Sequence, residues 1–510
     1  MKNITKILIE ELGKEIYMVG GALRDIFMSR CIKDIDIAVR HSKGNFEKKL
    51  NNIAKKIHFN VFPLNLSEKI YRMVFRRRKG KSSEDIFLDF SVIKEKDIRE
   101  NLKKRDFTIN AMAYPLTPKT TIEITKNFFR VDNFRKEDII DPLFGVKDLE
   151  KNLIRITDEL AIKKDPLRML RAFRLSAQLG FRIEKKSVKA MQQFVPKIKT
   201  VAAERVLGEL TLIFQSPNSV QYIREMAKIG LLFEIFPELK PQEKCAEVYY
   251  GKGGVLTHTY KVIERMDFLC ENGNKFIPGF SRISSFFARK SLLKTIALLH
   301  DIAKPEKAGI INGRLRFFGH EQFGALMAEA IMKRLRFSNE EIKIAKAAIF
   351  HHLRPGNLAS NNYISDKAVF RLFRDLGENI IYLLILCWAD HSSYISAKQL
   401  KKILPKLSLP PSPAPSKIFR KTGIAKTLRF LQVLNYLFKF YAEKGERISR
   451  KNIVNGKEVM RIMNLPEGPQ IGRILAKIRL LHFENKIKTK REAIDYLKKL
   501  GIQNSTVKRQ

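Results

Sequence analysis

The sequence predicts an α+β protein, with an α/β head followed by all-helical domains, and three observations support this class. Strand-like and helix-like patterns alternate up to about residue 150. Helical periodicity then predominates, broken by glycine-rich and proline-rich segments. At 510 residues the chain is too long for one hydrophobic core. We therefore expect a head, a helical neck, a histidine-rich helical domain, a proline-rich linker and a basic helical tail: residues 1–150, 151–245, 246–400, 401–416 and 417–510.

A glycine pair near the start of the head suits phosphate binding. Residues 16–19 predict a short apolar strand, which ends at Gly20 and Gly21. Glycines let backbone N–H groups approach a triphosphate closely. Arg24 adds a guanidinium group for phosphate oxygens. A tight turn without function remains the alternative, because Gly-Gly also serves simple turns after strands.

Three aspartates on two predicted strands are candidate metal ligands. Side chains alternate between faces over residues 34–39, so Asp34 and Asp36 point the same way. Asp89 lies among apolar residues on a similar strand, residues 86–92, where an unpaired charge would be costly. Three carboxylates suit a Mg²⁺-dependent phosphoryl or nucleotidyl transfer. Solvated strand faces remain the alternative.

Residues 104–113 combine a basic pair, an acid and an amide with an apolar run. Arg105 is a candidate to hold a triphosphate. Asp106 and Asn110 are candidates to contact a sugar or to order the pocket. An amphipathic element without function is the alternative.

Asp165 is predicted to cap a helix that starts at Pro166 and ends before Gly180. Three arginines follow at three-residue steps: Arg168, Arg171 and Arg174. Cytosine and adenine share an amino donor beside a ring-nitrogen acceptor. Asp165 can accept from the amino group while Arg168 donates to the ring nitrogen, which would select C and A without a nucleic-acid template. The other two arginines are left for phosphates or for positioning.

Histidines concentrate in the third predicted domain, where six of the nine lie between positions 258 and 391. An adjacent His-Asp pair, spaced histidines and a late aspartate form a metal-ligand pattern. The first-choice ligands are His258, His300, Asp301 and Asp390, and a second site would use His320 and His351. A helical scaffold that binds no metal is the alternative, and the pattern does not identify the metal.

The charge favours a polyanionic partner. Lys and Arg number 97 against 53 Asp and Glu, a formal charge of +44. Residues 401–510 alone carry 26 basic and 7 acidic residues, so the tail is a candidate nucleic-acid surface. Four scattered cysteines without a C-x-x-C pair fit a reducing cytoplasm. We find no signal-peptide pattern and no apolar run long enough for a membrane span, and expect a soluble protein.

Together these motifs resemble the class II tRNA nucleotidyltransferase and poly(A) polymerase family, in particular its CCA-adding members with an appended HD domain. The glycine pair with Asp34 and Asp36 is similar to the family's catalytic metal motif, and residues 105–111 to its ribose and triphosphate motif. Asp165-x-x-Arg168 is similar to the amino-acid template that pairs with CTP and ATP. Other segments resemble the hinge, the neck motif, the HD phosphohydrolase signature and two tail segments of the family: residues 141–149, 204–210, 300–301, 455–460 and 466–472.

The resemblance implies a cytoplasmic enzyme that adds C, C and A to the 3′ end of tRNA from CTP and ATP. It implies Mg²⁺ in the head, and tRNA rather than DNA or a membrane as the partner. The HD domain would hydrolyse phosphoesters at RNA ends with a divalent metal. Poly(A) synthesis, CC-only or A-only addition and an HD domain that merely binds RNA remain alternatives.

Three residues depart from the family pattern: Leu23, Lys104 and Lys164. Lys164 reverses a charge beside the proposed template and so bears on base choice. Residues 76–84 read as a mobile, basic connection between two strands. Family members carry a flexible loop there that is needed to admit the final A. The resemblance therefore leaves complete and partial CCA addition open.

Overall fold

The computed structural model describes residues 3–40, 45–79, 82–125, 128–361, 363–411, 423–448, 453–484 and 486–507. Its contacts divide the chain into two compact units. The first contains residues 1–213 and 225–235, and the second contains residues 214–224 and 236–510. Strands dominate only the first part of the chain, which confirms the predicted α+β class.

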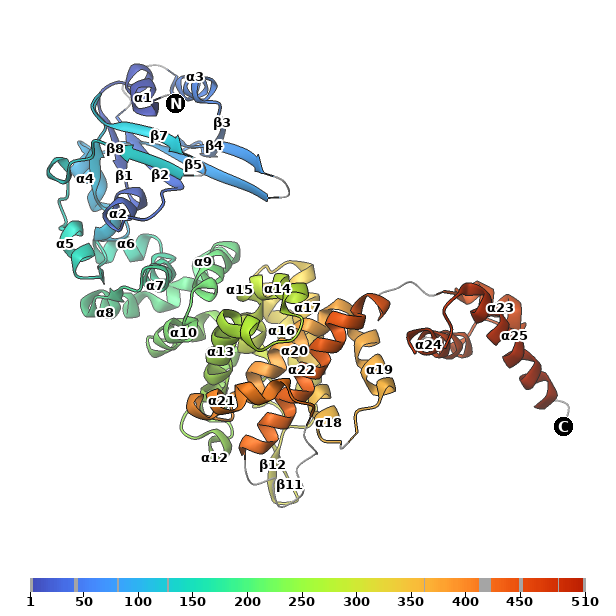
Figure 1. The fold of residues 1–510 in the computed structure, drawn as a ribbon. Coiled ribbons are helices and arrows are strands. Elements are labelled where there is room, and N and C mark those ends of the chain that lie inside the picture. Colours follow the sequence, from blue (N-terminus) through green and yellow to red (C-terminus); the bar gives the residue numbers. More distant parts are fainter. Residues whose placement is uncertain are drawn as a thin grey trace. The chain divides into compact units, whose positions relative to one another are not determined.

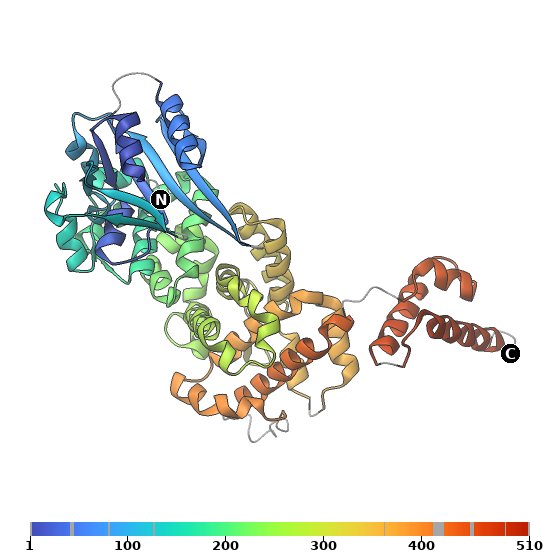
Figure 2. The same ribbon diagram turned by 45° about the horizontal axis from the view of Figure 1, so that its top comes forward.

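A six-stranded mixed sheet forms the centre of the head, in the order β3-β4-β5-β2-β1-β6 (Figures 1 and 2). Its strands are β1 (Ile16–Val19), β2 (Asp34–Val39), β3 (Asn60–Asn65), β4 (Ile70–Lys79), β5 (Ser82–Val92) and β6 (Ala113–Pro115). The pair β2 and β5 is parallel, and the other neighbouring pairs are antiparallel. Two of the predicted strands have the observed bounds, and the third lies within β5. A separate hairpin contains β7 (Thr121–Thr125) and β8 (Phe128–Asp132).

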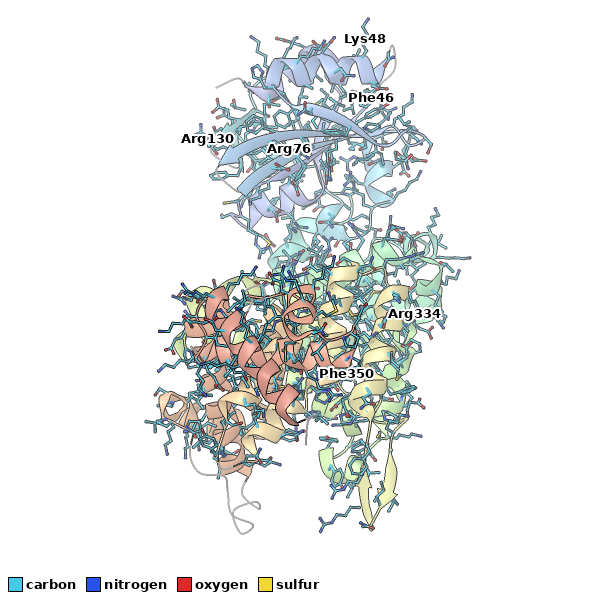
Figure 3. All side chains as sticks on the ribbon, turned by 90° about the vertical axis from the view of Figure 1, so that its right-hand side faces the viewer. Phe46, Lys48, Arg76, Arg130, Arg334 and Phe350 are labelled. Carbon is cyan, nitrogen blue, oxygen red and sulfur yellow. The ribbon has the colours of Figure 1, made fainter. Side chains whose placement is uncertain are left out.

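The mobile connection predicted over residues 76–84 is wrong for most of its length. β4 continues to Lys79 and β5 begins at Ser82, while residues 80 and 81 lie outside the described residues. Arg76, labelled in Figure 3, lies opposite Asp85, and their side chains approach to 3.6 Å. Opposite charges facing each other across an antiparallel pair favour continued strand pairing.

Helices surround the sheet and continue into the neck. The head contains α1 (Ile4–Leu12), α2 (Gly21–Phe27), α3 (Phe46–Ile57) and α4 (Ile98–Lys103). The following segment contains α5 (Gly145–Glu150), α6 (Glu159–Lys164), α7 (Arg168–Leu179), α8 (Lys185–Phe194), α9 (Ala203–Gln215), α10 (Ser219–Lys228) and α11 (Leu231–Ile235), with the short parallel pair β9 (Leu153–Ile154) and β10 (Arg182–Ile183).

A fully buried helix lies at the centre of the second unit. Helix α20 (Ile380–Ser392) is apolar around most of its circumference, which is typical of a helix enclosed by others. It packs against α13 (Gly254–Asn272), α15 (Lys290–Leu299), α17 (Asn339–His351) and α22 (Gly423–Ile448). The remaining elements before the tail are α12 (Glu247–Tyr250), α14 (Phe280–Ala288), β11 (Gly309–Ile311), β12 (Arg314–Arg316), α16 (His320–Arg334), α18 (Arg354–Ala359), α19 (Asp366–Leu376) and α21 (Ala397–Ile403).

The tail predicted over residues 417–510 is divided in the structure: α22 packs against α20, whereas the three helices after it surround a small core of their own. They are α23 (Gly456–Met463), α24 (Pro469–Phe483) and α25 (Lys490–Val507). The predicted linker is only partly described: residues 404–408 form a 3₁₀ helix that packs on α22, and residues 412–416 lie outside the described residues. Among the described residues no single helix is long and apolar enough to cross a membrane, although one bent pair, Lys367–Ser392 with Ala397–Ser408, passes the length and composition test.

Candidate functional site

The parallel pairing of β2 and β5 brings the predicted carboxylates together. Asp36 lies directly opposite Asp89 in the strand register, and Asp34 lies two residues earlier on the same face. The residues that alternate with them, Ile35 and Ile37, are fully buried on the opposite face and fix this orientation. Burial and the carboxylates of Asp89 and Asp34 raise the pKa of Asp36, against the guanidinium group of Arg105. Burial and Asp89 also raise the pKa of Asp34. This cluster of negative charge fits a divalent cation.

Asp89 has an arginine as its partner. Arg72 on β4 lies opposite it and donates two hydrogen bonds to its two carboxylate oxygens, from Nε at 2.8 Å and Nη2 at 2.7 Å. The negative charge of Asp89, which lies among apolar residues in the sequence, is therefore neutralised by the guanidinium group of Arg72. Asp34 and Asp36 are the carboxylates better placed to bind a cation.

The glycine pair makes room for this cluster. Gly20 has a φ of +75°, and a Cβ there would lie 2.6 Å from Oδ2 of Asp36 and 3.0 Å from Nη1 of Arg105. Any other residue would thus combine a strained backbone with a clash. Arg24, on the helix that follows, donates from Nη1 to Oδ1 of Asn110 at 2.9 Å. The predicted phosphate-binding arginine is therefore anchored to the second motif.

Asp106 connects that motif to the arginine-bearing helix. Its Oδ2 accepts from Nε and Nη2 of Arg171 at 2.9 and 2.6 Å, and its Oδ1 accepts from Nδ2 of Asn110 at 3.2 Å. Burial alone would raise the pKa of Asp106, but Arg171 outweighs it and holds that pKa below its usual value. Asp106 and Asn110 therefore join this motif to Arg24 and to Arg171 through side-chain hydrogen bonds.

A cavity of about 250 Å³ opens between these motifs and α7. Every residue that lines it is charged: Arg105, Asp106, Asp165, Arg168, Arg171 and Arg205. Four guanidinium groups around two carboxylates suit a phosphate-bearing ligand whose base offers both donors and acceptors.

The cap predicted at Asp165 is displaced. Helix α7 begins at Arg168 and its N-cap is Leu167, whereas Gly180 ends the helix as predicted, with a φ of +74°. Asp165 still accepts a hydrogen bond from the N–H of Leu167 at 3.3 Å, because it sits in the turn that precedes the helix. The other oxygen of its carboxylate remains available to a partner.

That partner is Arg205, whose Nη2 lies 2.9 Å from Oδ2 of Asp165. Arg168 instead donates to the carbonyl oxygens of Arg105 and Lys104, both at 3.0 Å. The predicted template residues thus line one cavity without pairing with each other. Asp165 is held by helix α9, and Arg168 is held by the backbone of residues 104 and 105.

Helix α9 also contacts the arginines of α7. One turn after Arg205, Glu209 forms ion pairs with two arginines: its Oε2 lies 2.8 Å from Nε of Arg174 and its Oε1 lies 3.7 Å from Nη1 of Arg171. Neither Arg205 nor Glu209 was among the predicted site residues. The sequence feature that contains both residues is the segment 204–210, which resembles the family's neck motif.

The histidine-rich segment forms a second, buried cluster in the other unit. Its potential ligand atoms form two groups, and within each group all of them lie within 4.8 Å of one another: His258, His300 and Asp390 in one, and Asp301, His320 and His352 in the other. All six residues are buried. His351, the predicted ligand, is half-buried and outside both groups. Successive helical residues point about 100° apart, so only one of two adjacent histidines can face the cluster.

Backbone carbonyls fix the orientation of three of these rings. Nδ1 of His300, His320 and His352 lies 2.8, 2.6 and 2.6 Å from the carbonyl oxygens of Ala297, Phe317 and Ile349. Since a carbonyl can only accept, each Nδ1 carries the proton and each Nε2 presents a lone pair to the cluster. Nε2 of His258 and His300 and Oδ1 of Asp390 are buried without a hydrogen-bond partner, as a metal site requires.

Three family models match successive parts of the chain. They are the poly A polymerase head domain over residues 16–155, the probable RNA and SrmB-binding site of polymerase A over residues 180–243, and the HD domain over residues 255–395. The strand carboxylates and the histidine cluster lie within these ranges, whereas Asp165 and the arginines of α7 lie between the first model and the second. The poly A polymerase head model agrees with the nucleotide-binding motifs of the first unit, and the HD model agrees with the histidine motifs of the second.

Curated relatives match almost the whole length of the chain. A CC-adding tRNA nucleotidyltransferase of Synechocystis sp. is 23% identical over 96% of this chain and 94% of its own. An A-adding tRNA nucleotidyltransferase of Deinococcus radiodurans is 24% identical over 93% of both chains. A solved structure of a CCA-adding enzyme shares the fold, with a TM-score of 0.58 and 19% identity over 97% of this chain and 96% of that chain. This chain belongs to the tRNA nucleotidyltransferase and poly(A) polymerase family, carries an HD domain, and is an enzyme of that type.

Proposed function

We propose that this enzyme adds C, C and A to the 3′ end of tRNA from CTP and ATP. The observation that carries the proposal is the all-charged cavity lined by Asp165 and Arg168, in the same unit as the paired carboxylates of β2 and β5. Such a cavity offers an acceptor and donors to a base without any nucleic-acid template. The names of the relatives support tRNA as the acceptor.

Asp34 and Asp36 would hold Mg²⁺, which activates the 3′ hydroxyl of the RNA and stabilises the leaving pyrophosphate. The 3′ oxygen attacks the α-phosphorus of the nucleotide and forms a new P–O ester bond. The bond between the α-phosphorus and the bridging oxygen breaks, and pyrophosphate leaves. Arg24 and Arg105 are placed to hold phosphate oxygens, and Arg171 and Arg174 keep α7 in place through Asp106 and Glu209.

Base selection would use the carboxylate of Asp165 as acceptor for an amino group and a guanidinium of the cavity as donor to the ring nitrogen. Arg168 is our first choice of donor, because its side chain lines the cavity close to Asp165. Uracil and guanine present a carbonyl oxygen and a ring N–H in the equivalent places, and would meet mismatched groups.

A tRNA that ends before its CCA sequence tests the proposal. Incubation with CTP and ATP, followed by sequencing of the 3′ ends, should yield C, C and A and then stop. Ends that stop at CC, or that gain A only on a CC end, would make this a partial-addition enzyme like the two relatives. A long A tract would overturn the assignment in favour of poly(A) synthesis.

A basic groove in the second unit supports RNA binding. It has a volume of about 360 Å³ and lies between α19 and α24. Both helices contribute residues at the spacing of one helical face: Lys367, Phe370, Arg371 and Arg374, and Arg473, Ala476, Lys477 and Leu480. Five cations over an apolar floor suit the phosphates of an RNA backbone.

Reversing two of these charges should weaken tRNA binding. We expect Arg371→Glu with Arg473→Glu to reduce affinity at least about tenfold and to lower the slope of log K against log salt by about 2, because each lost phosphate contact lowers it by roughly 0.7–0.9. Fluorescence titration of tRNA at several salt concentrations measures both. Lys398→Glu with Lys401→Glu, on the surface of α21, makes the same change in net charge and should have a smaller effect. Equal effects of the two pairs would show a general effect of charge.

The buried histidine cluster favours a second activity, metal-dependent hydrolysis of phosphoesters at RNA ends, with 2′,3′-cyclic phosphates as candidate substrates. The residues fit a divalent metal, because Nδ1 of His300, His320 and His352 faces a carbonyl, so that in the neutral ring Nε2 is the nitrogen able to bind a cation beside buried carboxylates. His258, His300, Asp301 and Asp390 would hold it. Ring nitrogens favour a transition metal over Mg²⁺.

His300→Ala combined with Asp301→Ala should abolish this hydrolysis and leave nucleotide addition within about twofold, because the head is a separate compact unit. Phosphate release from a cyclic-phosphate RNA and incorporation of labelled CTP measure the two activities in one preparation. Undiminished hydrolysis would rule out the site. Inactivity of the wild-type protein with several transition metals supplied would leave the cluster an RNA-binding element.

A further inference from the structure

One row of side chains runs across the head sheet from Asp36 to the outermost strand. Asp36 on β2 lies opposite Asp89 on β5, and Asp89 lies opposite Arg72 on β4. Arg72 in turn lies opposite Phe62 on β3, the edge strand of the sheet. Directly opposed residues share a face, so the four side chains form one row. Three strand spacings of about 4.8 Å place the backbone of Phe62 roughly 14 Å from that of Asp36.

The row becomes more exposed toward the edge strand. The side chains of Asp89 and Arg72 are 20% and 37% exposed, and Phe62 is 47% exposed. Helix α3 contacts β3, but its Phe46 (Figure 3) packs edge-on against Tyr71. Tyr71 precedes Arg72 on β4 and therefore lies on the other face. The exposed ring of Phe62 thus lies on the side of the sheet away from α3, where the carboxylates lie.

Arginines and a second aromatic ring lie near Phe62 on this face. The guanidinium carbon of Arg72 is 4.8 Å from the centre of the Phe87 ring, which is a cation–π contact. Arg76 lies further along β4 on the same face and is exposed. Surfaces that bind single-stranded nucleic acid combine the same groups, because bases stack on aromatic rings while cations attract the phosphates.

A second copy of the chain is the other natural occupant of an edge strand, because unpaired strand edges can pair with each other. Pro63 follows Phe62 and has no N–H group to offer such a partner. The pairing of β3 with β4 is also irregular between Pro63 and Asn65. Both features disfavour pairing between edges, and favour the ring of Phe62 over the backbone of β3 as the contact surface.

We propose that Phe62 is a stacking platform for a base of the RNA acceptor strand, with Arg72 and Arg76 beside the phosphates of that strand. The proposal rests on the function proposed above, because it needs an RNA whose 3′ hydroxyl lies at Asp34 and Asp36. At about 3.4 Å per stacked nucleotide, the distance along the row corresponds to a base up to roughly four nucleotides before that hydroxyl. Phe62 therefore contributes to the affinity for RNA and takes no part in the chemistry.

Four substitutions at this one position test the proposal on the full chain. Phe62→Ala and Phe62→Leu should raise KM for a tRNA that lacks its CCA end by about 5- to 100-fold, which is the effect of losing one base–aromatic stack. Phe62→Tyr and Phe62→Trp keep a ring and should stay within about threefold of the wild type. Steady-state addition of CTP measures these values. The kcat and the KM for CTP should change little in all four variants.

Leu66→Ala is the matched control. It removes an apolar side chain that is 65% exposed in the same segment, but Leu66 lies in the turn after β3 and outside the row. It should leave the KM for tRNA within about twofold of the wild-type value.

Fluorescence gives a readout that a structural role of Phe62 would not change. The chain has one tryptophan, Trp388, which is fully buried in the second unit. Phe62→Trp therefore adds an exposed fluorophore, and stacking on a base should quench it when tRNA is added without nucleotide. In a series of tRNAs with one abasic residue near the 3′ end, one member should fail to quench. That member should bind the wild type more weakly, and should bind Phe62→Leu as well as the unmodified tRNA does.

A wild-type KM for tRNA in Phe62→Leu, an equal loss in Leu66→Ala, or a fall in kcat alone would overturn the proposal. Gel filtration tests the other occupant: a dimer formed by the wild type but not by Phe62→Ala would assign β3 to a second copy and refute the platform.

The platform and the proposed function fail in different ways. If the 3′ ends carry a long A tract while Phe62→Leu still raises the KM for RNA, the platform stands and CCA addition is refuted. If the ends carry complete CCA and Phe62→Leu has the wild-type KM, CCA addition stands and the platform is refuted.

Discussion

Asp36→Asn should reduce nucleotide addition by about a thousandfold or more. Asp36 lies against Gly20 and opposite Asp89, where burial already disfavours its negative charge. An amide of the same shape keeps the packing but weakens cation binding. Charge stabilisation by a metal contributes several kcal/mol, and about 1.4 kcal/mol corresponds to each tenfold change in rate. Single-turnover incorporation of CTP into a tRNA lacking its CCA end measures the loss.

The comparison with Asp89→Asn makes this prediction specific. Arg72 already occupies both oxygens of Asp89. Loss of the Asp89 carboxylate should therefore act through the freed guanidinium group of Arg72 and lower the rate of addition roughly 10 to 100-fold. Glu137→Gln, an exposed substitution in the head, should leave the rate unchanged. Equal losses for Asp36→Asn and Asp89→Asn would mean that three carboxylates hold the metal. A loss below tenfold for Asp36→Asn would contradict its assignment as a metal ligand.

Local patterns predicted the strands that carry the catalytic motif. The alternation over residues 34–39 fixes which side chains enter the core, and the glycine pair ends the preceding strand, so both strands have the predicted bounds. The connection over residues 76–84 was misread because its basic residues look like a loop. Its strand pairing depends on opposing residues such as Asp85, which a single segment does not reveal.

Ion pairs between residues far apart in the chain could not be predicted from local sequence patterns. The pair Arg72 and Asp89 depends on the register of two strands, and the pair Arg205 and Asp165 depends on the approach of α9 to the turn before α7. The choice of His351 over His352 failed for a different reason. The two histidines are adjacent, and successive helical residues point about 100° apart, so only the fold shows which of them faces the cluster.

Replacing Asp165 by alanine should both slow the enzyme and relax its choice of base. The loss of a charge-assisted hydrogen bond to the amino group is worth about 1.5–3 kcal/mol, so kcat/KM for CTP should fall roughly 10 to 100-fold. The cavity would then contain mainly guanidinium donors, including Arg205, which is released from its ion pair. Donors suit the carbonyl oxygen of uracil better than the amino group of cytosine. The preference for CTP over UTP should therefore shrink.

Arg205→Ala separates selection from positioning. It removes the group that holds Asp165 but keeps the acceptor, so kcat/KM should fall about tenfold while the CTP to UTP ratio stays near the wild-type value. Asp165→Asn should lie between the two, because an amide presents either an acceptor or a donor. The ratio of kcat/KM for the two nucleotides, measured on one tRNA, discriminates among these cases. An unchanged ratio in Asp165→Ala would mean that the base is read by Arg168 and the backbone, and that Asp165 serves only to shape the turn before α7.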